Sequence, residues 1–227
     1  MSLQVTGIEV RLPDRARRSA LAYSAKKPMA EVSLSLDNGR MREIVVPVRV
    51  GRVLRDECIP LPQGEDEAFD AIHALEGRVC LAMLTEMLSR RDHGTEEAKR
   101  KLRLYGFRDI EIDAAVARAT ELRFLNDNRF AGYFIEERKR RGWGMRKVEA
   151  ELKRRGMDPT SIDGWPDAFF SPEDDMERAR QILSHKSVPS PRGYEKLVRH
   201  LVGKGFSFDV ASRAARERID DSDLDEA

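Results

Sequence analysis

A repeated pattern of five residues is the feature that most constrains how this chain can fold. The pattern is a glycine, a small or aliphatic residue four positions later, a leucine after four more, a second glycine, and then Phe or Met. Its copies, spaced 50 and 49 residues apart, are Gly94, Ala98, Leu102, Gly106 and Phe107; Gly144, Val148, Leu152, Gly156 and Met157; and Gly193, Leu197, Leu201, Gly205 and Phe206. Repeats of this length are typical of arrays in which similar units pack against their neighbours.

The repeat predicts a helix that ends at its second glycine. Apolar residues four positions apart lie on one helix face, so each copy has a core-facing stripe. The second glycine suits a left-handed cap, and the Phe or Met after it can pack back on the last turn. A large apolar residue stands ten positions before each opening glycine, at Leu84, Phe134 and Leu183, and marks a preceding helix. Phe130, Tyr133 and Phe134 form the expected stripe of that helix in the second copy.

A third, shorter helix follows in each copy, such as residues 110–122, so the unit is three helices. The fold class is therefore mainly α, with three tandem three-helix repeats that form an elongated, curved stack. The expected boundaries are 68–123, 124–171 and 172–218. Helix starts are indicated at Ser171-Pro172 and Ser190-Pro191, where an N-cap serine precedes a first-turn proline.

Residues 1–67 predict a small region that contains a β-hairpin, with a linker at its end. Residues 31–36 alternate apolar and polar side chains, and residues 37–39 supply a tight turn before a returning strand at 41–46. Another strand is expected at 5–12, a mobile loop at 15–27 and a short helix at 47–54. The run from Pro60 to Glu67 is expected to be an exposed linker that leaves this region separable from the helices.

The obvious catalytic and metal-binding patterns are missing, so we expect neither an enzyme nor a cofactor. Cys58 and Cys80 are the two cysteines, and without paired metal-ligand spacings Cys80 and His73 are expected to be a packed thiol and a surface imidazole. No phosphate-binding loop or nucleophile elbow occurs. The apolar runs are too short to span a membrane, and the start lacks a signal segment, which predicts a cytoplasmic protein.

A basic cluster in the second copy is the candidate binding site. The whole chain has a formal charge of only +1, whereas residues 138–155 contain nine cations and two acids, a net charge of +7. Cations at helix C-termini explain one or two charges per helix. The remaining excess indicates a surface for phosphates or an acidic protein. The candidates are Arg138, Lys139, Arg140, Arg141, Arg146, Lys147, Lys153, Arg154 and Arg155.

Two nearby features allow more than one interpretation. Trp143 either stacks on a base or packs between helices. Residues 219–227 carry five acids and no base, and this acidic tail either keeps the protein soluble or screens the basic cluster.

The sequence resembles the bacterial RecX regulatory proteins. Phe124-Leu125-Asn126-Asp127-Asn128-Arg129-Phe130-Ala131, the Arg-rich helix end, and Glu151-Leu152-Lys153-Arg154-Arg155-Gly156-Met157 are similar to that family's pattern. The resemblance covers about residues 68–218 and is strongest at 124–157.

The resemblance implies a non-enzymatic modulator of RecA, the recombinase that forms filaments on single-stranded DNA. It implies binding in the filament groove and inhibition of RecA ATPase, strand exchange and co-protease activity, and hence effects on recombinational repair and the SOS response. We expect a monomer with weak direct DNA binding. The alternatives are a DNA-binding helical-repeat protein that acts without RecA, and a purely structural helical adaptor.

Overall fold

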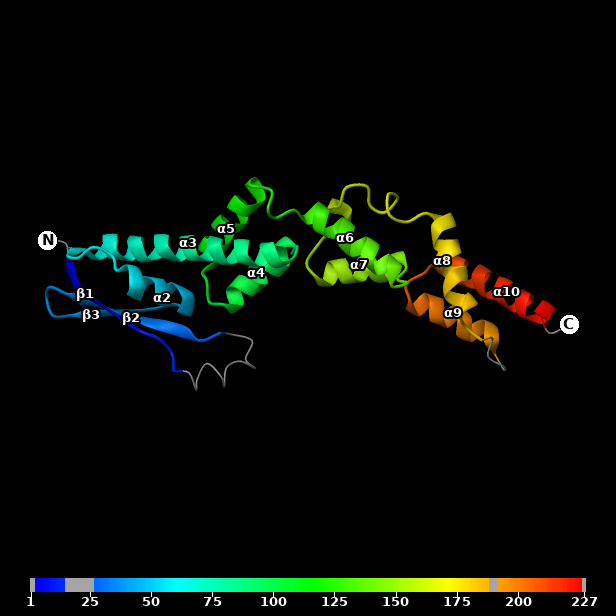
Figure 1. The fold of residues 1–227 in the computed structure, drawn as a ribbon, viewed down its shortest axis with the longest axis horizontal. Coiled ribbons are helices and arrows are strands. Elements are labelled where there is room, and N and C mark those ends of the chain that lie inside the picture. The colour runs from blue at the N-terminus through cyan, green and yellow to red at the C-terminus, as the bar shows by residue number, and fades with distance from the viewer. Residues whose placement is uncertain (1–2, 15–26, 188–191, 226–227) are drawn as a thin grey trace. The chain divides into compact units, whose positions relative to one another are not determined.

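The computed structural model describes residues 3–14, 27–187 and 192–225, and it divides into two compact units (Figure 1). The first unit is Met1–Asn126 and the second is Asp127–Ala227. The predicted loop at 15–27 and the predicted helix start at Ser190-Pro191 lie almost wholly outside the described residues.

The first unit begins with a four-stranded antiparallel sheet. Its strands are β1 (Gln4–Arg11), β2 (Met29–Leu36), β3 (Met41–Pro47) and β4 (Gln63–Gly64), in the order β3-β2-β1-β4. Alternate residues of β2 are buried, from Ala30 to Leu36, because successive side chains of a strand point to opposite faces. The predicted β-hairpin is thus confirmed as β2 and β3, within a larger sheet.

Two helices cover this sheet and give the first unit one core. Helix α2 (Val48–Glu57) lies between the sheet and helix α3 (Glu65–Arg90) (Figure 1). Gly51 lets α2 approach β2 closely, since a Cβ there would lie 2.6 Å from the Cβ of Ala30. Leu34 of the sheet and Ile72 and Leu84 of α3 belong to one buried cluster.

The predicted linker at residues 60–67 is wrong over its second half. Gln63 and Gly64 pair with β1, and the backbone N–H of Glu65 donates to the carbonyl of Leu3 at 2.9 Å. Helix α3 already begins at Glu65, where three acidic residues in the first turn favour the positive helix end. The sheet and the first repeat are therefore joined within one compact unit.

The helical copies follow the predicted order. The first copy contains α3, α4 (Thr95–Leu104) and α5 (Asp109–Glu121); the second contains α6 (Asp127–Arg140), α7 (Met145–Arg154) and the 3-10 helix η2 (Pro159–Ser161); the third contains α8 (Pro172–Ser184), α9 (Gly193–Gly203) and α10 (Phe208–Asp225). Ser171 caps α8 as expected, because its Oγ accepts from the N–H of Asp174 at 3.1 Å.

Three details differ from the sequence prediction. The third helix of the second copy is only one 3-10 turn, because Pro159, Gly164 and Pro166 interrupt helical structure there. Aromatic side chains such as Phe170 fill this part of the core instead. Tyr133 is 68% exposed and does not belong to the core stripe. The predicted acidic tail is helical through Asp225, as the end of α10.

The second helix of every copy ends in the same backbone cap. Gly106, Gly156 and Gly205 have φ angles of 90°, 83° and 96°, in the left-handed region. The N–H of the residue after each glycine donates to the carbonyl of the repeat leucine, which is the Schellman arrangement. These bonds join Phe107 to Leu102, Met157 to Leu152 and Phe206 to Leu201, at 3.3, 3.0 and 3.1 Å. All three leucines are completely buried, which confirms the predicted core positions.

Within the second unit, the cap of α9 docks on the first turn of α7. The N–H groups of Gly144 and Arg146 donate to the carbonyls of Lys204 and Gly205, at 2.8 and 3.1 Å. Helix N-termini have unsatisfied N–H groups and C-termini unsatisfied carbonyls, so each end completes the other. A Cβ on Gly144 would lie 2.5 Å from backbone atoms of Gly205 and Phe206. The opening glycine therefore allows this close approach.

In the first unit, the N-terminal region covers the corresponding helix end. The N–H of Lys27 donates to the carbonyl of Leu104 at 2.9 Å. A Cβ on Gly106 would lie 2.1 Å from the Sδ of Met29. The strand-rich region thus covers the C-terminal end of α4 in the first copy. In the third copy, the corresponding end of α9 contacts α7 of the second copy.

We expect Gly205→Ala to lower the free energy of unfolding by at least about 2 kcal/mol. A left-handed backbone costs a residue with a Cβ about 1–2 kcal/mol, and the new Cβ would lie 2.5 Å from the N and Cβ of Lys147. Gly203→Ala is the matched control, because no atom of the described residues lies within 4 Å of its Cβ position and alanine favours a helix. Urea unfolding should show the loss only at Gly205; equal effects at both glycines would contradict the docked cap.

A buried carboxylate, Glu97, lies in the first turn of α4 in the first unit. Its side chain is 8% exposed, and its Oε1 lies 2.5 Å from Arg91 Nη2, 3.2 Å from His93 Nδ1 and 3.4 Å from Lys101 Nζ. Burial raises the pKa of Glu97, but the hydrogen bond from Arg91 and the surrounding charges outweigh it and lower the pKa to about 2. The carboxylate is therefore ionised and stabilises the folded chain at neutral pH.

We expect Glu97→Gln to destabilise the chain at neutral pH and not at low pH. A pKa lowered from 4.5 to about 2 contributes stability that is complete above pH 5 and is lost as the pH falls towards 2. The shift corresponds to about 3 kcal/mol at pH 7. Urea unfolding from pH 7 to 3 should show the deficit shrinking below pH 5, whereas the exposed neighbour Glu96→Gln should change stability little. A deficit that stays constant with pH would contradict the charge network.

Candidate partner-binding surface

The structure divides the nine predicted basic residues into packed and exposed groups. All nine lie at the C-terminal end of α6, at the start of the turn to α7, in α7 itself or at its C-cap. The core beneath them is rich in aromatic rings, including Phe130, Phe134 and Phe170, with Trp143 and Trp165 packed against it.

Arg138, Lys139 and Arg155 pack against this aromatic core. The guanidinium of Arg138 lies 4.7 Å from the ring centre of Phe134 and 5.0 Å from that of Trp143, and its side chain is only 15% exposed. Lys139 donates to the carbonyl of Phe169 at 2.5 Å, and Arg155 lies 4.9 Å from the ring centre of Phe134. Cations over aromatic faces stabilise the fold, so these three residues have structural contacts.

The other six cations face solvent, and we call them the basic surface. They are Arg140, Arg141, Arg146, Lys147, Lys153 and Arg154. Five are exposed and Lys147 is half-buried, with its Nζ 4.5 Å from the ring centre of Trp143. These residues lie on α6, on α7 and in the turn between them, so the surface belongs wholly to the second copy.

Acidic neighbours hold part of the basic surface in place. Lys153 binds Glu149 at 2.6 Å, and Arg154 binds Glu151 at 2.6 Å. The hydrogen bond from Arg154 lowers the pKa of Glu151, and the one to Glu149 raises the pKa of Lys153, so both Glu151 and Lys153 stay charged. Arg141 similarly pairs with Glu137.

Arg140 and Arg146 make no ion pair within the part of the chain that the structure describes. Both side chains are exposed, so each guanidinium has its donors available to an incoming acceptor. They are the best candidates for direct contact with a partner.

A cleft of about 590 Å³ lies beside the basic surface, within the second unit. Arg140 and Arg141 line it from the second copy, and Lys204 and Arg178 from the third. The sequence analysis missed Lys204, although it shares with Arg155 the position directly before a closing glycine. The cleft brings cations from two copies together, which the repeat pattern alone did not show.

Arg178 positions the end of α6 and was also missed by the sequence analysis. Its side chain is 13% exposed, and its Nη2 donates to the carbonyls of Trp143 and Lys139, the latter at 3.3 Å. Its Nη1 binds Asp175 at 2.9 Å. One guanidinium of α8 thus satisfies backbone carbonyls at the end of α6, which carries Arg140, and in the turn that follows it, which carries Arg141.

Trp143 packs between elements of the second unit, in agreement with one of its two interpretations. Its ring packs against the aromatic core, and the charged groups of Arg138 and Lys147 lie over the ring. Its carbonyl accepts from Arg178. These contacts account for the residue without a nucleic-acid base.

The remaining residues singled out from the sequence have ordinary structural positions. Cys80 is completely buried, and burial raises the pKa of its thiol to about 12. His73 packs beside Phe69, with ring centres 6.3 Å apart. Over the described residues, no three metal-binding side chains gather in one place, and none of the helices has the length and apolar character needed to cross a bilayer.

Comparison with known proteins identifies the family of this chain. Residues 126–164, which contain the basic surface, match the family model described as "RecX, second three-helix domain". Regulatory protein RecX of Vibrio campbellii is 33% identical over 133 residues, which are 57% of this chain and 84% of the relative. RecX of Pseudomonas tolaasii is 32% identical over 144 residues, 62% of this chain and 90% of the relative. The chain belongs to the RecX family.

Solved RecX structures have a similar fold. The crystal structure of RecX from Lactobacillus salivarius superposes with a TM-score of 0.55 and 19% identity, over 64% of this chain and 97% of the other. A second RecX crystal structure gives a TM-score of 0.55 and 16% identity over 92% of this chain and 96% of the other. The second comparison therefore includes much of the strand-rich region.

The RecX-like sequence motifs have structural roles here. Asn128 forms two hydrogen bonds with Asp163, of 2.8 and 3.0 Å, which tie the start of α6 to the segment after η2. Glu151 pairs with Arg154 and Arg155, while Gly156 and Met157 form the cap of α7. These residues shape the second copy and so support its exposed cations.

We expect the packed and exposed cations to respond differently to truncation. Arg138→Ala should lower the free energy of unfolding by about 1–2 kcal/mol, because it removes contacts with two aromatic rings. Arg146→Ala should change it by less than about 0.5 kcal/mol, because that side chain is exposed. Urea unfolding of both variants measures the difference, and equal losses would show that the division into two groups is incorrect.

Proposed function

We propose that the chain regulates RecA by binding the filament that RecA forms on single-stranded DNA. Binding would reduce RecA ATPase, strand exchange and co-protease activity, and so modulate recombinational repair and the SOS response. The supporting observation is the basic surface, which lies within the part of the chain that matches the RecX family model. We further propose that the chain acts as a non-enzymatic monomer in the cytoplasm.

The basic surface and the adjoining cleft suit an acidic protein face or a phosphate backbone. Several cations act together over a short distance, so they raise both the encounter rate and the affinity for a negatively charged partner. Because the surface is exposed, salt should weaken this attraction. Arg140 and Arg146 contribute most in this proposal, since neither pairs with a carboxylate among the described residues.

The proposed contact set is smaller than the nine residues taken from the sequence. Arg138, Lys139 and Arg155 are largely covered by their own module and would act by positioning the aromatic core. The proposed contacts are Arg140, Arg141, Arg146, Lys147, Lys153 and Arg154, with Lys204 beside them across the cleft.

A second candidate function is direct DNA binding that does not need RecA. It is favoured by the same two unpaired arginines, because guanidinium groups bind phosphate oxygens readily. Such binding would weaken steeply with salt, through release of counterions from the DNA. Titration of labelled single-stranded DNA at moderate salt, with and without RecA, distinguishes the two functions.

We expect Arg140→Glu combined with Arg146→Glu to raise, by at least tenfold, the concentration needed to suppress RecA ATPase. Tenfold corresponds to about 1.4 kcal/mol of binding free energy. The change should leave the helical circular-dichroism signal and melting temperature intact, because both side chains are exposed and pair with no residue in the described part of the chain. The measurement is ATP hydrolysis by RecA on single-stranded DNA, titrated with each variant.

The matched control reverses two exposed arginines elsewhere, Arg118→Glu and Arg213→Glu. Their side chains are 51% and 61% exposed and form only surface pairs. This control keeps the same change in net charge and should inhibit like the parent. If both double variants inhibit equally at physiological salt, the basic surface is not the contact site.

A further inference from the structure

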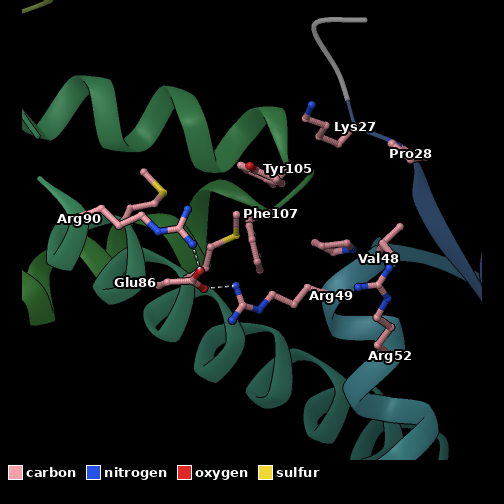
Figure 2. A pocket seen from close by; sticks show the side chains of 12 residues that line it. Lys27, Pro28, Val48, Arg49, Arg52, Glu86, Arg90, Tyr105 and Phe107 are labelled. Carbon is pink, nitrogen blue, oxygen red and sulfur yellow. Dashed lines mark hydrogen bonds and ion pairs between the residues drawn. The ribbon is translucent and has the colours of Figure 1, made fainter. Parts of the chain in front are cut away.

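A pocket of about 450 Å³ lies in the first unit, where the strand-rich region meets the first helical copy (Figure 2). Helix α2, the C-terminal half of α3, the cap of α4, the end of β3 and the two residues before β2 all contribute to its walls. Its volume is in the range of sites that hold small ligands, about 300–1,000 Å³. It shares no residue with the basic surface.

The floor of this pocket is apolar and adaptable. Met83 and Phe107 are 8% and 5% exposed, and Met87 and Val48 are partly exposed beside them. Methionine side chains adjust their shape and have polarisable sulfur atoms, so such a floor accepts a large apolar group of varied form. Tyr105 adds one accessible ring at the edge, with 39% of its surface exposed.

The mouth of the pocket is strongly basic. Lys27, Arg49, Arg52 and Arg90 line it, and Glu86 is the single acid among the lining residues. Figure 2 shows Arg90 on one side, Arg49 and Arg52 on the opposite side, and Lys27 beyond Tyr105. The lining therefore has a net charge of +3 around an apolar floor.

Glu86 fixes the two arginines that face each other. Its oxygens bind Arg49 Nη1 at 2.6 Å and Arg90 Nη2 at 2.7 Å. The hydrogen bond from Arg49 lowers the pKa of Glu86, so the carboxylate stays charged. Each guanidinium has five N–H donors, and donors not used by Glu86 remain for a ligand. Arg52 makes no ion pair with any described residue and leaves its charge unbalanced.

We infer that this pocket binds an acidic peptide segment that inserts one large apolar side chain. The apolar side chain would occupy the floor formed by Met83, Met87 and Phe107, while flanking carboxylates pair with Arg49, Arg52 and Arg90. Burial of an apolar anchor supplies affinity, and the fork of each arginine matches a carboxylate. The proposed site is additional to the basic surface.

The same charges could attract nucleic acid, but the floor favours a peptide. Proteins that hold single strands offer aromatic faces on which successive bases stack. Here Phe107 is covered by its neighbours and Tyr105 is the one accessible ring of the lining. The cations also surround one hollow rather than follow a track along which a phosphate backbone would run.

The test uses the full chain and a short labelled peptide, Asp-Glu-Leu-Phe-Asp-Glu. Fluorescence anisotropy should give a Kd of about 10–100 µM. Replacing the acids by Asn and Gln, or Leu and Phe by Ser, should each weaken binding at least tenfold. The methyl signals of Met83 and Met87, assigned with Met→Leu variants, should shift when the acidic peptide is added.

Arg52→Glu should weaken peptide binding at least tenfold, and Arg55→Glu less than twofold. Arg55 is the matched control, because it lies on the same helix, is 55% exposed and does not line the pocket. A Kd weaker than about 1 mM, equal effects of the two reversals, or unshifted Met83 and Met87 signals would each overturn the proposal. Displacement of the peptide by oligothymidine with a lower Kd would also overturn it, in favour of a nucleic-acid site. The assay contains no RecA, so its outcome does not depend on the proposed regulation of RecA, and a peptide bound at the basic surface would leave Arg52→Glu without effect.

Discussion

The backbone cap at the closing glycine is the interaction on which the helical part of this structure depends. At Gly106, Gly156 and Gly205 a left-handed residue turns the chain, and the following Phe or Met is buried beside the repeat leucine. A residue with a Cβ would strain this turn. In the second unit the same cap also supplies carbonyls to the first turn of α7. The end of one helix thus completes the start of another, and the second and third copies are joined through it.

Much of the fold follows from local sequence patterns, and the departures have physical causes. Period-two alternation located β2, and the repeat leucines located the core of each copy. The strand β4 was missed because two residues, Gln63 and Gly64, have no pattern of their own and become a strand only by pairing with β1. The third helix of the second copy was overestimated because its aromatic residues fill the core without helical structure. In both segments, the local structure depends on pairing or packing with residues that are distant in the sequence.

The candidate site, like the fold, could be predicted from the sequence only in part. Charge counting found the basic cluster, but it could not tell a cation packed over Phe134 from one that faces solvent. That distinction depends on rings brought together from α6, α7 and the segment after η2. Arg178 and Lys204 come from the third copy, far along the chain, and only the docked helices bring them to the cleft. The pocket between α2 and α3 had no sequence signal, because its four cations are scattered among unrelated motifs.

The joint between Gly144 and Gly205 is made from main-chain atoms, and this bears on how such a chain can grow during evolution. Side chains contribute little to the hydrogen bonds across it, so their identities can drift while the joint is kept. A gene segment that encodes both a helix start with an opening glycine and a helix end with a closing glycine carries both halves of the connection. Tandem duplication of that segment produces a new copy already able to attach to its parent. The surfaces of the copies are then free to diverge, and one of them can become strongly basic.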